Sequence, residues 1–288
     1  MVHGSMVALA TPFRNGEVDA DALAHLVQWH IDNRTQGIVA LGTTGEADTL
    51  TQEEYRLVLK TVTQAAGKRL PIIAGATSNN PVEAIELAQM AQACDADGIL
   101  CAAGYYLNPT QEGLYQHLKA VHDHSELPLI LYNIPPRTIA DLQPKTVARL
   151  ANLERVVGIK DATKDLSRVT QERLLIDKPF DFLSGEDKTA PAYNAQGGHG
   201  CISVTANIAP KLCYQLQEAC ERGDFYSALE VHERLMPLHL ALFLEPSPAG
   251  IKFAMSELGL CRDEVRIPFV PVNEKTKTQI RKALTHIA

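Results

Sequence analysis

The chain has 288 residues, of which 27 are basic and 34 acidic, so its formal net charge is -7. This acidic balance argues against nucleic acid or an anionic membrane as a partner, because both are held mainly by lysine and arginine. No apolar run approaches the roughly 18 residues of a membrane-spanning helix, and the start lacks the features of a signal peptide. The six cysteines form no C-x-x-C pair, which favours reduced thiols and a cytoplasmic location.

Eight short apolar runs recur along the chain, and each is nearly continuous rather than alternating. Runs of this kind are typical of strands that are buried on both faces. They occupy residues 6–11, 37–41, 71–76, 98–103, 128–132, 156–160, 180–184 and 201–205.

Helix start signals lie between these runs. Thr51 and Glu54 form a capping box, and Asn80 precedes Pro81 at a first helical position. Further starts are expected at Asp19, Thr110 and Pro144. Strand starts spaced by roughly 20–35 residues match one βα unit, so the pattern predicts a closed (β/α)8 TIM barrel. A doubly wound open sheet is the main alternative, but the turn after the first strand reads Ala-Thr-Pro-Phe-Arg and lacks the glycines that such a fold would need.

The chain shows no linker and no second composition regime, so we expect one structural unit. Residues 1–222 would form the catalytic barrel, and residues 223–288 a C-terminal helical extension packed on it. Apolar spacing predicts extra helices over 224–239 and 246–258.

Lys160 is the sharpest signal among the residues at strand ends, where the chemistry of this fold takes place. It closes a buried apolar run, and removal from water favours the neutral amine, which is the nucleophile that forms a Schiff base with a 2-oxo acid. The alternative is a lysine that reaches the rim or pairs with Asp161. Lys252 is a weaker candidate, because its flanks fit an amphipathic helix.

Tyr132 ends the strand before that of Lys160, so the two side chains are expected to meet at the barrel mouth. A phenol that is hydrogen-bonded to hydroxyl groups can carry the proton that imine formation requires. Thr43 or Thr44 could relay it, and the glycines that flank them would let backbone amides approach a carboxylate.

The remaining polar motifs are expected to be structural. The histidines show no ligand triad, which argues against a metal-dependent aldolase. The glycine-rich segment 197–200 precedes the last strand, so we place it at the opposite, stabilising face of the barrel.

Four motifs in order resemble the dihydrodipicolinate synthase / N-acetylneuraminate lyase family, whose members are pyruvate-dependent class I aldolases on a (β/α)8 barrel. They are Gly42–Glu46, Tyr132–Thr138, Gly158–Thr163 and Gly197–Asn207. The resemblance runs over nearly the whole chain, including the helical tail.

The resemblance implies a role for each site residue and a homotetramer built as a dimer of dimers. Lys160 would form the Schiff base with pyruvate, and Tyr132 would donate and accept the proton. The other implied site residues are Thr43 in the relay, Tyr106 in the relay of the neighbouring subunit, Thr44 at the pyruvate carboxylate, and Gly185 and Ile202 lining the site through main chain. No metal and no organic cofactor is expected.

Arg137 points within the family to the branch that condenses pyruvate with L-aspartate 4-semialdehyde, on the path to diaminopimelate and lysine. A guanidinium suits bidentate binding of the aldehyde's carboxylate. Leu107, Asn108 and Ile139 depart from the usual family pattern near the substrate mouth. One alternative is a sister aldolase that acts on sialic acid or a 2-keto-3-deoxy sugar acid. The other is a non-catalytic pyruvate-binding barrel.

An allosteric lysine site is a further implication of the resemblance. Asn79, Glu83 and Tyr105 keep the polar character that a lysine zwitterion needs. Ala47, Gln52 and Tyr55 depart from the pattern of a lysine-sensitive enzyme, so we expect lysine feedback to be weak or absent.

Overall fold

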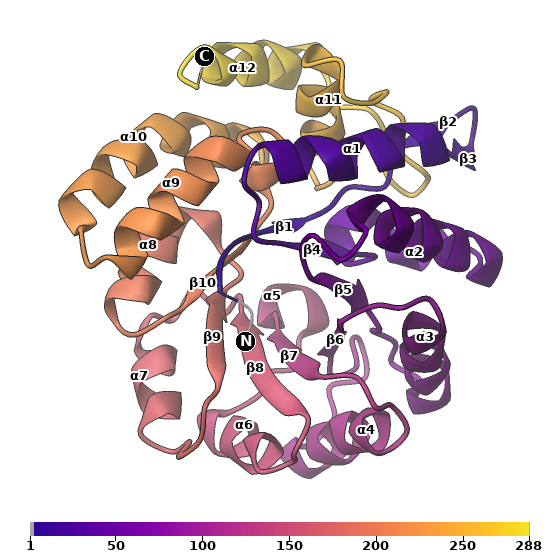
Figure 1. Cartoon of the computed structure of the whole chain (residues 1–288), viewed down its shortest axis with the longest axis vertical. Coiled ribbons are helices and arrows are strands. Elements are labelled where there is room, and N and C mark those ends of the chain that lie inside the picture. Colours follow the sequence, from indigo (N-terminus) through magenta and orange to yellow (C-terminus); the bar gives the residue numbers. More distant parts are fainter. Residues whose placement is uncertain (1–2, 288) are drawn as a thin grey trace.

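Eight parallel strands close into a barrel in the computed structural model, which describes residues 3–287 (Figure 1). They are β1 (Gly4–Ala8), β4 (Gly37–Ala40), β5 (Ile72–Gly75), β6 (Gly98–Ala102), β7 (Leu129–Asn133), β8 (Val156–Asp161), β9 (Asp181–Ser184) and β10 (Gly200–Ser203). Each strand pairs with its neighbour in chain order, and β10 returns to β1. Each predicted run overlaps one of these strands, so the predicted (β/α)8 barrel is confirmed.

Helices connect the strands and begin where their caps predict. Asp19, Asn80 and Thr110 each accept a backbone N–H in the first turn of a helix, and Thr51 and Glu54 form the expected capping box. The helices are α1 (Ala20–Asp32), α2 (Gln52–Ala66), α3 (Pro81–Ala93), α4 (Gln111–Asp123), α5 (Pro135–Thr138), α6 (Pro144–Ala151), α7 (Ser167–Arg173), α8 (Ala190–Ala195) and α9 (Pro210–Glu221).

Three more helices pack along one side of the ring, coloured orange to yellow in Figure 1. They are α10 (Phe225–Ala241), α11 (Ala249–Glu257) and α12 (Glu274–Leu284). We did not predict α12, because its segment is mostly polar and only a few of its side chains, such as Ile280 and Ala283, are buried. The hairpin of β2 (Phe13–Arg14) and β3 (Glu17–Val18) was also not predicted.

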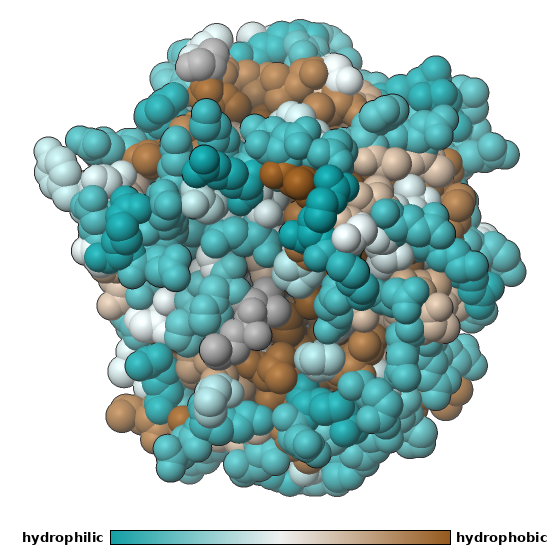
Figure 2. Space-filling view, in the orientation of Figure 1, coloured by the Kyte–Doolittle hydropathy of each residue, from teal (hydrophilic) through white to brown (hydrophobic). Residues whose placement is uncertain are grey.

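The core has two layers, one inside the barrel and one between the strands and the helices. Side chains such as Met6, Val39, Ile73 and Leu100 fill the barrel interior, which makes it a packed core rather than a pore. Figure 2 shows a mostly hydrophilic surface on the face in view. Among residues 3–287, no helix combines the length and the apolar character that crossing a membrane requires.

Candidate active site

Lys160 lies at the carboxyl end of β8, directly beside Tyr132 of β7 in the strand register. Its side chain is buried, with 6% of the residue exposed, and its Nζ lies 4.4 Å from the centre of the Tyr132 ring. We find no hydrogen bond or ion pair of this amine with any other residue in the range 3–287. The amine is therefore enclosed, in contact with an aromatic ring and free to react.

Asp161, the alternative partner of Lys160, is occupied elsewhere. Successive side chains of a strand point to opposite faces, and the Asp161 Oδ1 accepts the backbone N–H of Thr163 at 2.7 Å. Burial raises the pKa of the Asp161 carboxyl, and the nearby Arg168 opposes this rise. The alternative of a Lys160–Asp161 pair is therefore not what the structure shows.

A cavity of about 360 Å³ opens in front of Lys160. Five further residues expected at the site line it, namely Thr43, Thr44, Tyr132, Arg137 and Gly185. At Gly185 a Cβ atom would lie 2.9 Å from the Ala162 Cβ and 3.1 Å from the Lys160 Cε. Glycine is therefore required there, because any side chain would press on the lysine.

Thr43 and Thr44 stand in a short 3-10 turn, η1 (Thr43–Gly45), after β4. Glu46 follows the turn in a left-handed conformation with φ of 55°, which is costly for a residue with a Cβ. Its buried side chain anchors the turn, because the Glu46 Oε2 accepts the backbone N–H of Arg266 at 2.9 Å.

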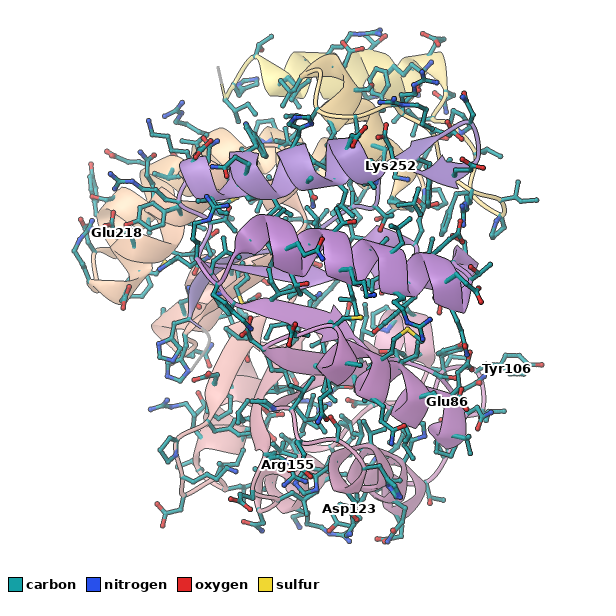
Figure 3. The ribbon with its side chains drawn as sticks, turned by 45° about the vertical axis from the view of Figure 1, so that its right-hand side comes forward. Glu86, Tyr106, Asp123, Arg155, Glu218 and Lys252 are labelled. Carbon is teal, nitrogen blue, oxygen red and sulfur yellow. The ribbon has the colours of Figure 1, made fainter. Side chains whose placement is uncertain are left out.

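Lys252 of α11 is the second anchor of this turn, and Figure 3 places it between α1 and the C-terminal helices. Its amine lies 2.5 Å from the Glu46 Oε1, donates to the Glu264 carbonyl at 2.9 Å, and sits 3.8 Å from the centre of the Phe13 ring. Burial lowers the Lys252 pKa, and Glu46 opposes this shift. The C-terminal extension thus holds the threonine turn through a buried ion pair.

Two of the expected site residues do not line this cavity in the described part of the chain. Ile202 is buried in the barrel interior with Tyr132. Tyr106 is 81% exposed and projects away from the body of the molecule (Figure 3). Within one chain Tyr106 is therefore not part of the Lys160 site.

A second cavity of about 380 Å³ adjoins the first and shares Thr43, Tyr132 and Arg137 with it. Of the proposed lysine-binding residues, Glu83 and Tyr105 line it, whereas Asn79 is not among its described lining residues. Burial and the charge of Glu83 raise the pKa of the Asp48 carboxyl, also in this lining. This cavity is acidic, unlike the first.

Sequence reasoning gave no role to several lining residues of the Lys160 cavity. The charged ones are Lys164, Glu186, Asp187 and Lys188, and the extension adds Phe243 and Ser247. Glu186 and Asp187 follow the seventh predicted strand, so the sequence places them at a strand end, but it assigns them no role. Residues of the extension carry no such signal.

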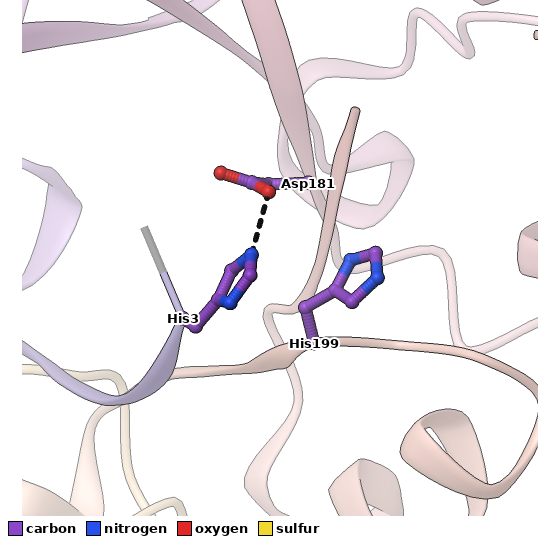
Figure 4. Close-up of side chains that lie close together, drawn as sticks. All are labelled: His3, Asp181 and His199. Atoms are coloured by element: carbon purple, nitrogen blue, oxygen red, sulfur yellow. Dashed lines mark hydrogen bonds and ion pairs between the residues drawn. The ribbon is translucent and has the colours of Figure 1, made fainter. Parts of the chain in front are cut away.

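His3, Asp181 and His199 form a polar cluster (Figure 4). His3 and His199 directly precede β1 and β10, and Asp181 begins β9, so the cluster lies at the end of the barrel opposite Lys160. Its ligand-type atoms lie within 4.8 Å of one another, so the fold brings together two histidines and a carboxylate that the sequence did not place side by side. The Phe182 N–H donates to the His199 Nδ1 at 3.1 Å, which puts the ring proton on Nε2 and leaves that atom no lone pair for a metal ion. The His3 Nε2 lies 2.8 Å from the Asp181 Oδ1, so the cluster links the starts of β1 and β9.

Comparison with known proteins gives one family. A family model described as "Dihydrodipicolinate synthetase family" matches residues 1–287. The 4-hydroxy-tetrahydrodipicolinate synthase of Roseobacter denitrificans is 51% identical over 286 residues, covering 99% of this chain and 98% of the relative.

Two solved structures illustrate the likeness in three dimensions. The chloride-inhibited dihydrodipicolinate synthase of Acinetobacter baumannii, complexed with pyruvate, is 43% identical with a TM-score of 0.97 and coverage of 100% and 99%. The enzyme of Cyanidioschyzon merolae with lysine bound is 31% identical, with a TM-score of 0.96 and coverage of 99% and 98%.

The fold and the site define a (β/α)8-barrel enzyme with a lysine enclosed at a strand end. The chain belongs to the dihydrodipicolinate synthetase family. The predictions of family, fold and synthase activity are therefore confirmed.

Proposed function

We propose that this enzyme condenses pyruvate with L-aspartate 4-semialdehyde through an imine on Lys160. The observation that carries the proposal is the unpaired, enclosed Lys160 amine beside Tyr132, facing a cavity of about 360 Å³. A neutral amine in that position attacks the pyruvate C2 carbonyl, and loss of water from the carbinolamine gives the imine. The imine then withdraws electrons from C3, so the chemistry requires no metal ion or organic cofactor.

Proton transfer in this scheme falls to Tyr132 and Thr43. Both line the cavity, and a phenol in contact with hydroxyl groups can move protons on and off the reacting oxygen. The enamine carbon attacks the aldehyde, and the substrate's amino group then closes the ring at C2 and releases Lys160. Thr44 and the backbone of its turn are proposed to hold the pyruvate carboxylate, with Gly185 and Ile202 as main-chain neighbours.

Arg137 is proposed to bind the carboxylate of the aldehyde substrate. It lines the cavity, and within residues 3–287 its guanidinium makes no ion pair. A free guanidinium at a cavity mouth suits a bidentate carboxylate.

Tyr106 is proposed to complete the relay of a partner subunit in a homotetramer of two tight dimers. The support is its 81% exposure, next to Leu107 at 62%, because large apolar side chains exposed together favour an interface. Mixing Tyr106→Phe with Lys160→Ala chains tests this. Regained activity in verified hybrid dimers is expected, and none would contradict a role in trans.

The acidic second cavity is proposed as a place where lysine could bind weakly. Glu83 and Asp48 offer carboxylates for an ammonium group, but the Tyr55 hydroxyl already donates to the Gly75 carbonyl at 2.7 Å. We expect half-inhibition by lysine well above about 1 mM in a titration of initial rates. Inhibition far below that concentration would contradict weak feedback.

Turnover is the direct test of the proposed reaction. Purified enzyme with pyruvate and L-aspartate 4-semialdehyde should form the cyclic product, and a metal chelator should leave the rate unchanged. Cleavage of sialic acid or of a keto-deoxy sugar acid in place of this condensation would favour the sister aldolase. The location is proposed to be the cytoplasm, since the described cysteines are all free thiols.

A further inference from the structure

The lining of the Lys160 cavity contains two acidic side chains, Glu186 and Asp187. They differ in how far their oxygens are already used. Asp187 is buried and accepts the Ser203 hydroxyl on one oxygen and the backbone N–H groups of Val204 and Thr205 on the other. Its carboxylate therefore holds the turn after β10 and is not available to a ligand.

Glu186 has oxygens that remain available. Its carboxylate is 16% exposed, and its partners in the described chain are the ammonium groups of Lys164 and Lys188, each at 3.5 Å. Both distances are those of ion pairs rather than of close hydrogen bonds. Both lysine side chains are partly exposed, at 56% and 31%, so they can swing into solvent. The Glu186 carboxylate thus forms two ion pairs and still has oxygen lone pairs that can accept a hydrogen bond from a ligand.

The substrate pair in the proposed function brings one cation into this cavity. Pyruvate is an anion, whereas L-aspartate 4-semialdehyde carries an α-ammonium group beside its carboxylate. An ammonium group that leaves water needs a carboxylate partner, because an unpaired charge in a partly enclosed site is costly. Of the two carboxylates in the lining, Glu186 alone has oxygens to offer.

We propose that Glu186 is a specificity-determining residue that binds the α-ammonium of the aldehyde substrate, displacing Lys164 and Lys188. Together with Arg137 on the carboxylate, it makes the site selective for an amino-acid aldehyde over an aldehyde acid without the amine. This inference rests on the proposed function and names the recognition element for its second substrate.

The backbone of Lys164 supports a functional role for the charged rim. Lys164 adopts φ of 68°, a left-handed conformation that is unfavourable for a residue with a Cβ. Strain of this kind concentrates at functional sites. The strained backbone of Lys164 places its ammonium group beside the Glu186 carboxylate.

The test compares the substrate with succinate semialdehyde, which differs only by lacking the α-amino group. The analogue cannot close the ring, so it is measured as an inhibitor competitive with the aldehyde. Glu186→Gln should raise the KM for L-aspartate 4-semialdehyde by about 10- to 100-fold, the value of one charge-assisted hydrogen bond. The inhibition constant of succinate semialdehyde should stay the same or fall, since a negative charge has been removed.

Two further variants keep the result decisive. Glu186→Asp keeps the charge and should restore part of the preference, and Glu230→Gln, an exposed site on α10, should change neither constant. Equal increases in KM and in the inhibition constant for Glu186→Gln would overturn the proposal, as would an unchanged KM. Borohydride trapping of pyruvate on Lys160 in the same preparation distinguishes failure of this inference from failure of the proposed function. If wild-type enzyme neither traps pyruvate nor turns over, the proposed function fails; if it does both and Glu186→Gln keeps its selectivity, only this inference fails.

Discussion

Lys160 and Lys252 are both buried, but their surroundings differ. The Lys252 amine has a carboxylate at 2.5 Å, a carbonyl at 2.9 Å and an aromatic face at 3.8 Å. The Lys160 amine has an aromatic ring at 4.4 Å and a cavity. Burial alone therefore does not make a nucleophile. An unpaired amine that faces space for a substrate does, whereas a saturated amine holds structure.

The largest expected effect is on activity at Lys160. Lys160→Ala removes the covalent nucleophile, so kcat should fall on the order of 10⁴-fold or more. Thermal unfolding should show little loss of stability, because no ion pair is broken. Retention of more than about a tenth of the wild-type rate would contradict the assignment.

Lys252→Ala should act on stability instead. Breaking a buried ion pair leaves Glu46 uncompensated and typically costs about 3–5 kcal/mol. Denaturant unfolding measures this cost, and the double variant Lys252→Met with Glu46→Gln, which removes both charges, should recover most of it. A loss of unfolding free energy below about 1 kcal/mol, as for a surface ion pair, would contradict the structural role assigned to Lys252.

Glu172 of α7 extends the comparison to a buried carboxyl group, which lines neither cavity and has no ion pair within residues 3–287. Burial, and then the charge of Asp161, raise its pKa from 4.5 to about 8. Between these values the folded chain holds a proton that the unfolded chain releases, so stability falls as pH rises through the window. One such proton corresponds to about 1.4 kcal/mol per pH unit.

Glu172→Gln should remove that slope. The variant and the wild type should differ little in unfolding free energy near pH 5, and the variant should gain in relative stability as pH rises toward 8. Parallel curves for the two proteins across this range would show that Glu172 does not titrate there.

Arg137→Ala should give the smallest effect, confined to the aldehyde. Loss of a charge-assisted pair is expected to cost about 1.5–3 kcal/mol, seen as a higher KM for L-aspartate 4-semialdehyde. The pyruvate imine should still form. If the variant fails to bind pyruvate, Arg137 belongs to the other half of the site.

The barrel was predictable from the sequence because strands buried on both faces read as apolar runs and the helix caps are local signals. The sequence also predicted that four side chains would meet, because the ends of parallel strands converge on one face of the barrel. They are Lys160, Tyr132, Thr43 and Arg137, which line one cavity. The Glu46–Lys252 pair and the roles of Glu186 and Asp187 were not, because they depend on side-chain distances between segments far apart in the chain. The polar helix α12 was missed because few of its side chains are buried.

The central claim is that Lys160, and not Lys252, forms the imine. Incubation with pyruvate and borohydride, followed by peptide mapping, should give one reduced adduct on the Lys160 peptide. The adduct should be absent from Lys160→Ala and present in the folded Lys252→Met, Glu46→Gln double variant. An adduct on the Lys252 peptide, or one that persists in Lys160→Ala, would contradict the account.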